Sequence, residues 1–588
     1  MSTPNEREET EEADMETKRW KTAAPRGAQM QPLSEVEREL LRRGYELFER
    51  FRSGLTEAHD EMRRARMLRQ LRQDERSATA PVGNTLGSCV DNAIADQVDN
   101  LPEAQLLPER EETARSAEEM SDVVSYVLYH AGWPGKYQVI MEDAIVTGTG
   151  VAEVFWDDEA EDGEGMVNVL AWHPEDFYPD PAVENLQDGR ACFKVTHTTV
   201  DWVEAHYPHA KGYVGEDRSL PWQEGLGEDA PQDDARTTLI EFWYKRYDAN
   251  SRSTSVHMAQ MAGGALLYST ELGFGGADRA AYADGVYAHG QYPFTLYKFR
   301  HVWRRPFGTG LIHDYRETQG AIDRYTKYID DNARQSSIQR HFIRRGSGIN
   351  AEDVADMRKT IIEWEGSDIR EVLQTVQAQP LSGQVYEMMT YLADSMKQDC
   401  GQNQFTRGEA GLGVTAASAI EALQNAGNKI TRWHTEIFKD AFREMVEQII
   451  WVLSEYLEPG RTLRIVGGWD STGRMRDRLV TLIAPGAEGA GLMRPAYAVR
   501  VQVQKNNPLQ IQADNEFLQQ VVEVCAKAGQ PMPPETVVRL MEGYRTKNSV
   551  LAALEENSRT AQLIAQLQAE NEALRREVMP LDEAMAAL

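Results

Sequence analysis

Long apolar runs are missing from this 588-residue sequence. The most apolar stretch, IIWVLSEYL from Ile449, soon meets Glu455 and falls short of the ~20 apolar residues that a membrane-spanning helix needs. The N-terminal MSTPNEREETEEADMETKR has no apolar core, which excludes a signal peptide. We therefore expect no membrane partner, and we interpret residues 1–30 as a disordered acidic tail.

Cysteine and basic charge are also scarce. Cysteine occurs only at positions 89, 192, 400 and 525, with no CxxC pair. This spacing argues against a disulfide framework and a zinc site, and it fits a reducing cytoplasm. The 63 Lys and Arg are outnumbered by 93 Asp and Glu, so the formal net charge is -30. A tight DNA clamp built on a broad positive surface is therefore not expected, and any DNA contact must be local or weak.

Sequence motifs of common enzyme sites are absent as well. There is no GxxxxGK[ST] or GxSxG motif, and the GTG triplets at 148 and 308 lack a GxGxxG context. The acidic run DDEAEDGE at 157–164 is interpreted as a solvated turn. The run EDFYPDP places Asp176 and Asp180 near His173, which leaves a metal-dependent nuclease as a minor alternative. A two-metal site needs carboxylates from several rigid elements. We therefore predict no catalytic residue, no metal and no cofactor.

The first half of the chain predicts helices followed by a β-rich region. Residues 34–75 show helical spacing behind a capping box of Ser34 and Glu37, and residues 114–130 form a second helical stretch. From Gly148 the pattern changes to strands: GVAEVFWDDEAEDGEGMVNVLAW is typical of two strands joined by an acidic turn. ACFKVTHTTV, TLIEFWYKRYD, SVHMAQMA and ALLYSTEL continue in β character.

The second half predicts long helices around a small insert. Helices are expected at 310–336, 383–397 and 415–457, with a mixed α/β unit of roughly 40 residues between the first two. A loop with Gly408, Gly411 and Gly413 leads into the last of these helices, which opens with TAASAIEALQ. TLRIV and YAVRVQVQ are predicted strands, and two further helices start near 509 and 534. The final forty residues carry a heptad seam that requires a partner, which we expect to be another copy of the chain.

This order of elements resembles the portal (head–tail connector) protein of tailed bacteriophages. The resemblance rests on a β-rich segment ending in PFGTG, the helix DYRETQGAIDRYTKYIDDNARQ, the insert, a return helix, the glycine loop and TAASAIEALQ. GTGVAEVFW, HPEDFYPDP and EFWYKRY are similar to the wing of short-tailed phage portals. The resemblance implies a mixed α/β, predominantly helical portal fold, divided as follows: wing 31–309, stem helices 310–336 and 381–400, clip 337–380, tunnel loop 401–414, long wing helix and return strands 415–508, and crown with coiled coil 509–588.

The resemblance also implies a function and a set of partners. Portal subunits form a ring, typically of about twelve copies, at one capsid vertex of the virion. Double-stranded DNA is packaged and ejected through the ring, which docks the large terminase subunit and later adaptor and tail proteins. Major capsid and scaffolding proteins would be further partners, and assembly would take place in the host bacterial cytoplasm. The alternative is a cytoplasmic oligomeric helical scaffold with a C-terminal coiled coil and no DNA role.

Individual residues are assigned by the same resemblance. A glycine-rich tunnel loop changes conformation at little steric cost and grips passing DNA weakly. The predicted site residues are, for the tunnel loop, Asn403, Gln404, Arg407, Gly408, Gly411 and Gly413; for the clip, Arg340, Arg344, Arg345 and Trp364; for the stem interface between subunits, Tyr315, Ile322, Tyr325 and Ile329; and for the crown seam, Ile564, Leu567, Asn571 and Leu574.

Overall fold

A computed structural model describes most of the first 456 residues and a few later segments. The described residues are 31–69, 84–99, 101–108, 114–217, 235–249, 252–337, 381–401 and 429–456, with short pieces between 340 and 376 and between 462 and 537. The predicted acidic tail, most of the predicted tunnel loop, Trp364 and the heptad seam with Asn571 lie outside these residues.

Two antiparallel sheets form the β-rich region that the sequence predicts. The larger sheet has the order β4-β5-β6-β7-β8, with bounds Phe177–Pro179, Ala191–Thr199, Arg236–Asp248, Ser253–Ala262 and Ala265–Ser269. The smaller sheet has the order β3-β2-β9, with bounds Met166–Trp172, Thr149–Asp157 and Phe294–Lys298. The acidic run joins β2 to β3 as predicted, and it contains the short helix α6 (Ala160–Gly163).

Helices pack around both sheets. They are α2 (Glu35–Arg69), α3 (Thr85–Val98), α4 (Ala114–His130), α5 (Trp133–Thr147) and α12 (Lys429–Tyr456). The predicted capping box is present, because the Ser34 amide donates to Glu37 Oε2 at 2.7 Å. The helix predicted at 114–130 is confirmed, whereas α3 and α5 were not predicted. α5 is buried on most of its circumference, so its sequence shows no one-sided apolar stripe.

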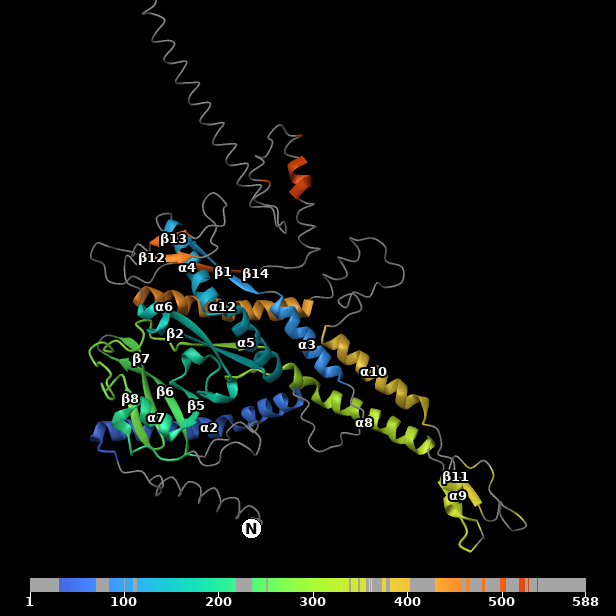
Figure 1. Ribbon diagram of the computed structural model, residues 1–588. Coiled ribbons are helices and arrows are strands. Elements are labelled where there is room, and N and C mark those ends of the chain that lie inside the picture. Colours follow the sequence, from blue (N-terminus) through green and yellow to red (C-terminus); the bar gives the residue numbers. More distant parts are fainter. Residues whose placement is uncertain are drawn as a thin grey trace, which may run out of the picture.

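Side-chain contacts fix α2 and α12, which lie against the body in Figure 1. Phe48 and Phe51 of α2 meet Phe193 of β5 edge-on, with ring centroids 5.3 and 5.5 Å apart. On α12, the Gln448 side chain donates to the Tyr292 carbonyl at 3.3 Å and accepts from Thr295 Oγ1 at 3.3 Å. A buried amide with partners on both sides fixes the position of the helix along the smaller sheet.

The two GTG triplets, which the sequence discounts as nucleotide motifs, lie against each other. Gly148 ends α5 with φ 105°, and a Cβ atom there would lie 2.4 Å from the Gly308 carbonyl oxygen. The Gly308 amide donates to Thr149 Oγ1 at 2.9 Å. Only glycine combines this backbone conformation with this close approach. The motifs therefore join α5 and β2 to the segment that leads into α8.

Segments far apart in sequence pair in two smaller sheets. β1 (Pro102–Pro108) pairs with β14 (Tyr497–Val503), with Leu106 opposite Val499. β12 (Thr462–Ile465) pairs with β13 (Arg478–Thr481). The strands predicted in TLRIV and YAVRVQVQ are confirmed, and their partners were not predicted.

A helical hairpin projects away from the body and carries a small unit at its tip (Figure 1). Its arms are α8 (Leu311–Ser337) and α10 (Gly383–Asp399), close to the predicted helices. The tip contains the two-stranded sheet of β10 (Arg340–Ile343) and β11 (Leu373–Val376), together with α9 (Ala351–Ala355). Among the described helices, none is long and apolar enough to cross a membrane.

Candidate functional site at the base of the α8–α10 hairpin

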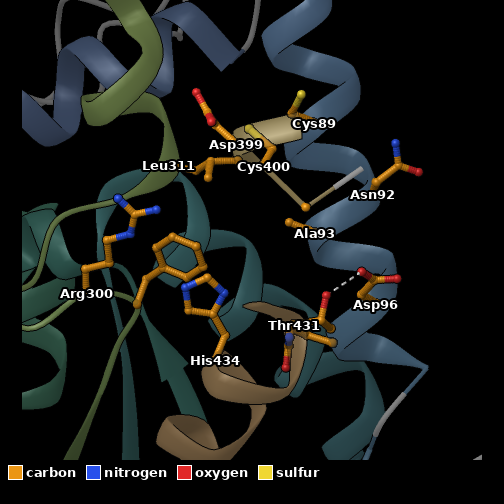
Figure 2. Close-up of a pocket in the computed structure, with 13 residues that line it drawn as sticks. Cys89, Asn92, Ala93, Asp96, Arg300, Leu311, Asp399, Cys400, Thr431 and His434 are labelled. Atoms are coloured by element: carbon orange, nitrogen blue, oxygen red, sulfur yellow. Dashed lines mark hydrogen bonds between the residues drawn. The ribbon is translucent and has the colours of Figure 1, made fainter. Parts of the chain in front are cut away.

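Four helices meet around a cavity of about 70 Å³ where the hairpin joins the body (Figure 2). α3 forms one wall, and the start of α8, the end of α10 and the start of α12 form the others. The cavity is lined by Cys89, Asn92, Ala93, Asp96, Gln97, Phe299, Arg300, Leu311, Asp399, Cys400, Gly401, Thr431 and His434.

A buried glutamine fixes α8 to α3. Gln319 is 9% exposed, and its Oε1 accepts from the Leu86 amide at 2.9 Å. Its Nε2 donates to Asp323 Oδ1 at 2.8 Å. The first-turn amides of a helix have no partner within the helix, so Gln319 satisfies a donor that would otherwise be buried alone. The base of the hairpin is thereby joined to the body by a specific polar contact.

Polar contacts also join α12 to α3. Thr431 Oγ1 donates to Asp96 Oδ2 at 3.1 Å, and Thr435 Oγ1 donates to Gln97 Oε1 at 3.2 Å. Burial raises the pKa of Asp96, although the hydrogen bond from Thr431 opposes this shift. The two threonines lie one helical turn apart, so they contact α3 from one face of α12.

His434 is the buried titratable group of this cavity. It is 6% exposed, and its ring lies 4.1 Å from the Phe299 ring, centroid to centroid. Burial lowers the pKa of His434 to about 4, and the nearby Arg300 guanidinium acts in the same direction. The imidazole is therefore neutral at pH 7 and packs as part of the core.

The residues on either side of the undescribed segment 402–428, which contains most of the predicted tunnel loop 401–414, border this cavity. α10 ends at Asp399, and Gly401 follows with φ 83°, a left-handed conformation that commonly terminates a helix. Gly401 on one side and Thr431 on the other line the cavity. The chain therefore leaves and rejoins the described body at one place. Asn403, Gln404, Arg407 and the three loop glycines lie outside the described residues.

The predicted stem interface needs correction at one position. Ile322 is 3% exposed and belongs to the subunit's own core, so it offers no surface to a neighbour. Tyr315 also packs partly against that core, while Tyr325 and Ile329 are half-buried. A regular apolar stripe marks the face that packs inside the subunit, which explains the misassignment.

Exposed apolar side chains on the hairpin were missed by the sequence analysis. Tyr328 of α8 and Tyr386 and Tyr391 of α10 are 53%, 61% and 65% exposed, and Met388 is 45% exposed. In the sequence, the three tyrosines lie outside the apolar stripes of their helices, whereas Met388 lies on the predicted stripe of α10 and is nevertheless exposed.

The tip of the hairpin presents further exposed side chains. Arg344 and Arg345 are exposed as predicted for a docking unit, and Arg340 lies at the start of β10. Phe342 and Ile361 are 61% and 79% exposed. Trp364 lies outside the described residues.

The residues considered for a metal-dependent nuclease site each pair with a different side chain. Asp180 is 3% exposed and pairs with Arg190 at 3.1 Å. His173 Nδ1 lies 2.8 Å from Asp143 Oδ2, and this hydrogen bond raises the pKa of His173. Asp176 Oδ1 lies 3.7 Å from the His197 ring. In the part of the chain that the structure covers, no three His, Cys, Asp or Glu side chains are grouped so as to hold a metal ion.

Comparison with protein families supports the resemblance drawn from the sequence. Residues 47–279 match the model of the phage P22-like portal protein family. This segment is similar to the portal proteins of that family. It runs from α2 to just beyond β8, so it contains the whole five-stranded sheet and most of the α2 contacts. No curated protein matches the chain.

The portal family places the chain in a broad functional class. The family is structural rather than catalytic, and its proteins are oligomeric components of the phage capsid vertex. The hairpin and its tip lie beyond the matched residues, so their roles rest on their own geometry.

Proposed function

We propose that the chain is the subunit of a ring-shaped portal channel, through which phage DNA is packaged and ejected. The observation that carries this proposal is the portal family match in the body, combined with a projecting hairpin at the position expected for a stem. In this proposal residues 310–336 and 381–400 are the stem, 337–380 the clip and 401–414 the tunnel loop. The chain has no enzymatic role.

The proposed contact between neighbouring subunits involves the exposed hairpin face. Tyr328, Tyr386 and Tyr391 are large side chains that the subunit leaves open to solvent. Exposed apolar groups gathered on one projecting element mark an interaction surface. Because a ring needs repeated head-to-tail contacts, these side chains pack against a different face of the next hairpin. Tyr325 and Ile329 lie at the margin of this contact.

The cavity supports the proposed tunnel loop. Gly401, at which the predicted loop begins, and Thr431, in the helix predicted to follow it, line the same cavity, and Thr431 is hydrogen-bonded to Asp96 of α3. An anchored helix gives a loop a rigid base, so the loop can change conformation without disturbing the body. The subunit charge of -30, repeated around a ring, repels the DNA backbone and keeps contacts weak. Weak contacts let DNA slide, because each phosphate contact would otherwise have to be broken at every step.

The tip is the proposed docking unit for the packaging terminase and then for adaptor and tail proteins. Arg344 and Arg345 offer charged contacts, and Phe342 offers an apolar one. Aromatic and arginine side chains are the residues that most often dominate protein interfaces. Capsid and scaffolding proteins would contact the body of the ring.

Electron microscopy and mass measurement of purified protein test the proposal. Wild-type protein should form closed rings with a central hole, whereas Tyr386→Glu/Tyr391→Glu should leave monomers or open fragments. Tyr247→Glu is the matched control, because Tyr247 is 64% exposed on the wing and should leave rings intact. A thermal unfolding transition close to that of the wild-type protein would show that the double variant is folded. Elongated bundles in place of rings would refute the channel and support the helical scaffold.

DNA binding provides the second test. Duplex DNA should bind weakly, and its affinity should fall steeply as salt rises. Tight retention of duplex at physiological salt would contradict a channel that lets DNA slide.

A further inference from the structure

Two cysteines meet at the base of the hairpin although they lie far apart in sequence. Cys89 is on α3 and is 1% exposed, while Cys400 directly follows α10 and is half-buried. Both line the cavity, and Figure 2 shows them side by side. The neighbouring Cys89 thiol helps to raise the pKa of the Cys400 thiol. Neither cysteine forms a disulfide bond in this structure.

The surroundings hold this thiol pair in place. α3 is fixed at its N-terminal end by Gln319 and at its C-terminal end by the threonines of α12. The Cys400 amide donates to the Met396 carbonyl at 3.0 Å, which keeps Cys400 on the last turn of α10. The third described cysteine, Cys192, lies in β5 and takes no part in this pair. Two cysteines that line one small cavity from separately anchored elements need little movement to form a bond.

We propose that Cys89 and Cys400 form a redox pair, which a small-molecule disulfide converts into a cross-link between α3 and the end of α10. The more exposed Cys400 thiolate attacks the small disulfide, forming a mixed disulfide and releasing one small thiolate. Cys89 loses its proton and attacks Cys400 Sγ, which forms the Cys89–Cys400 bond and releases the second small thiolate. Two protein thiols are oxidised, and one small disulfide is reduced to two thiols.

The cross-link would act where the hairpin, the body and the chain toward 402–428 meet. Gly401 is the next residue after Cys400, so the bond would fix the exact point at which the chain leaves α10. It would also close a long loop that contains both sheets and α8, which restricts the unfolded chain. The inference rests on the position of the two thiols beside each other and holds whether or not the protein forms a channel.

The environment makes the exchange slow at neutral pH. The neighbouring Cys89 thiol and burial both raise the pKa of the Cys400 thiol. The reactive thiolate is therefore a small fraction at pH 7, and the exchange should accelerate as pH rises. Reduced protein is thus expected to persist in a reducing compartment and to oxidise gradually after leaving it.

Peptide mapping of the full chain tests the proposal. Reduced protein is incubated with oxidised glutathione at mildly alkaline pH, quenched with acid, denatured, alkylated and digested. We expect one peptide pair linked through Cys89 and Cys400, absent after treatment with dithiothreitol. Thermal unfolding should shift upward in the oxidised sample, and the shift should vanish on reduction. Cys192→Ser should leave the linked pair unchanged, and Cys400→Ser should abolish it.

Several results would overturn the proposal. Alkylation of both Cys89 and Cys400 after prolonged oxidation would show that the sulfurs do not join. A stable glutathione adduct on Cys400 without the linked pair would show that Cys89 cannot resolve it. Linkage of Cys400 to Cys525, or to Cys400 of a second copy, would assign the reactivity to another partner. Ring formation, measured separately, decides the proposed function without bearing on any of these outcomes.

Discussion

Replacing Lys194 with methionine should destabilise the two-sheet region more than any surface charge change. Lys194 Nζ lies 3.1 Å from Glu153 Oε1 and 2.8 Å from Glu241 Oε2. It also lies 4.6 Å from the Trp172 ring centroid. Lys194 and Glu153 are 7% and 5% exposed, so this ion triad connects the two sheets through an almost dry interior.

The expected cost follows from the charges that remain. Methionine keeps the aliphatic stem of the side chain and removes the ammonium, which leaves Glu153 and Glu241 buried beside each other. Removing one partner of a buried ion pair costs about 3–5 kcal/mol, because the other charge is left unpaired. By contrast, Lys439→Met should change the free energy of unfolding by less than about 1 kcal/mol, since its 2.7 Å pair with Glu436 lies at the surface.

The destabilisation should also depend on pH. Burial raises the pKa of Glu153, and the neighbouring Lys194 ammonium opposes that shift. Without Lys194 the carboxyl pKa rises further above its unfolded value. The ionised form therefore costs stability fully above the folded pKa; this cost decreases as pH falls below that pKa and disappears below the unfolded pKa of about 4.3. The deficit of the variant should shrink between about pH 8 and pH 5.

Thermal unfolding and amide hydrogen exchange of β2, β5 and β6 provide the measurement. Hydrogen exchange measures the stability of these three strands separately from the rest of the chain. This local measurement is needed because a chain of several units does not unfold in one step. Adding Glu153→Gln to Lys194→Met should recover part of the lost stability. Two results would refute this reasoning. One is a loss of stability in Lys194→Met no larger than that in Lys439→Met, and the other is a loss in Lys194→Met that is the same at about pH 8 and about pH 5.

Three further predictions concern single contacts. Gly148→Ala should destabilise the protein by about 2 kcal/mol or more and lower its melting temperature, because φ 105° and the Gly308 carbonyl both exclude a Cβ; Gly135→Ala, with open space around it, should be nearly neutral. Gln319→Leu should cost about 1–3 kcal/mol and speed amide exchange at the start of α3, and unchanged exchange there would contradict the anchoring role. Asp143→Asn should lower the pKa of His173 in an NMR titration; the raised pKa stabilises the fold below the unfolded pKa of about 6.5, and this stabilisation is lost as pH rises through the folded value.

The sequence predicts well those elements that carry a one-sided pattern. α4, α8 and α10 pack one face against the body, so their apolar residues recur at helical spacing and their bounds match closely. The strands β2, β3 and β5 to β8 alternate or form short apolar runs between turn residues, and they were found in the same way. β4 lies in a stretch that was interpreted as irregular, because it is only three residues long. α5 was missed because burial on most sides removes the contrast that periodicity needs.

The candidate site was predicted only in part. The sequence places the predicted tunnel loop between α10 and a long helix, but it contains no signal that Gly401 and Thr431 border one cavity with α3. Ile322 was assigned to a subunit interface because a stripe shows that a face is apolar, not what covers it. The exposure of the hairpin tyrosines could be recognised only from the structure, which shows which residues pack inside the subunit.

By itself, the sequence determined the broad class of the chain, the bounds of most helices and strands, and the acidic charge balance. These properties depend on the local spacing of residues and on composition, which do not change with the tertiary structure. Tertiary structure alone decided that β1 pairs with β14, that the GTG triplets touch, and that Cys89 meets Cys400. Such meetings depend on how distant segments pack in space, and no spacing along the chain encodes them.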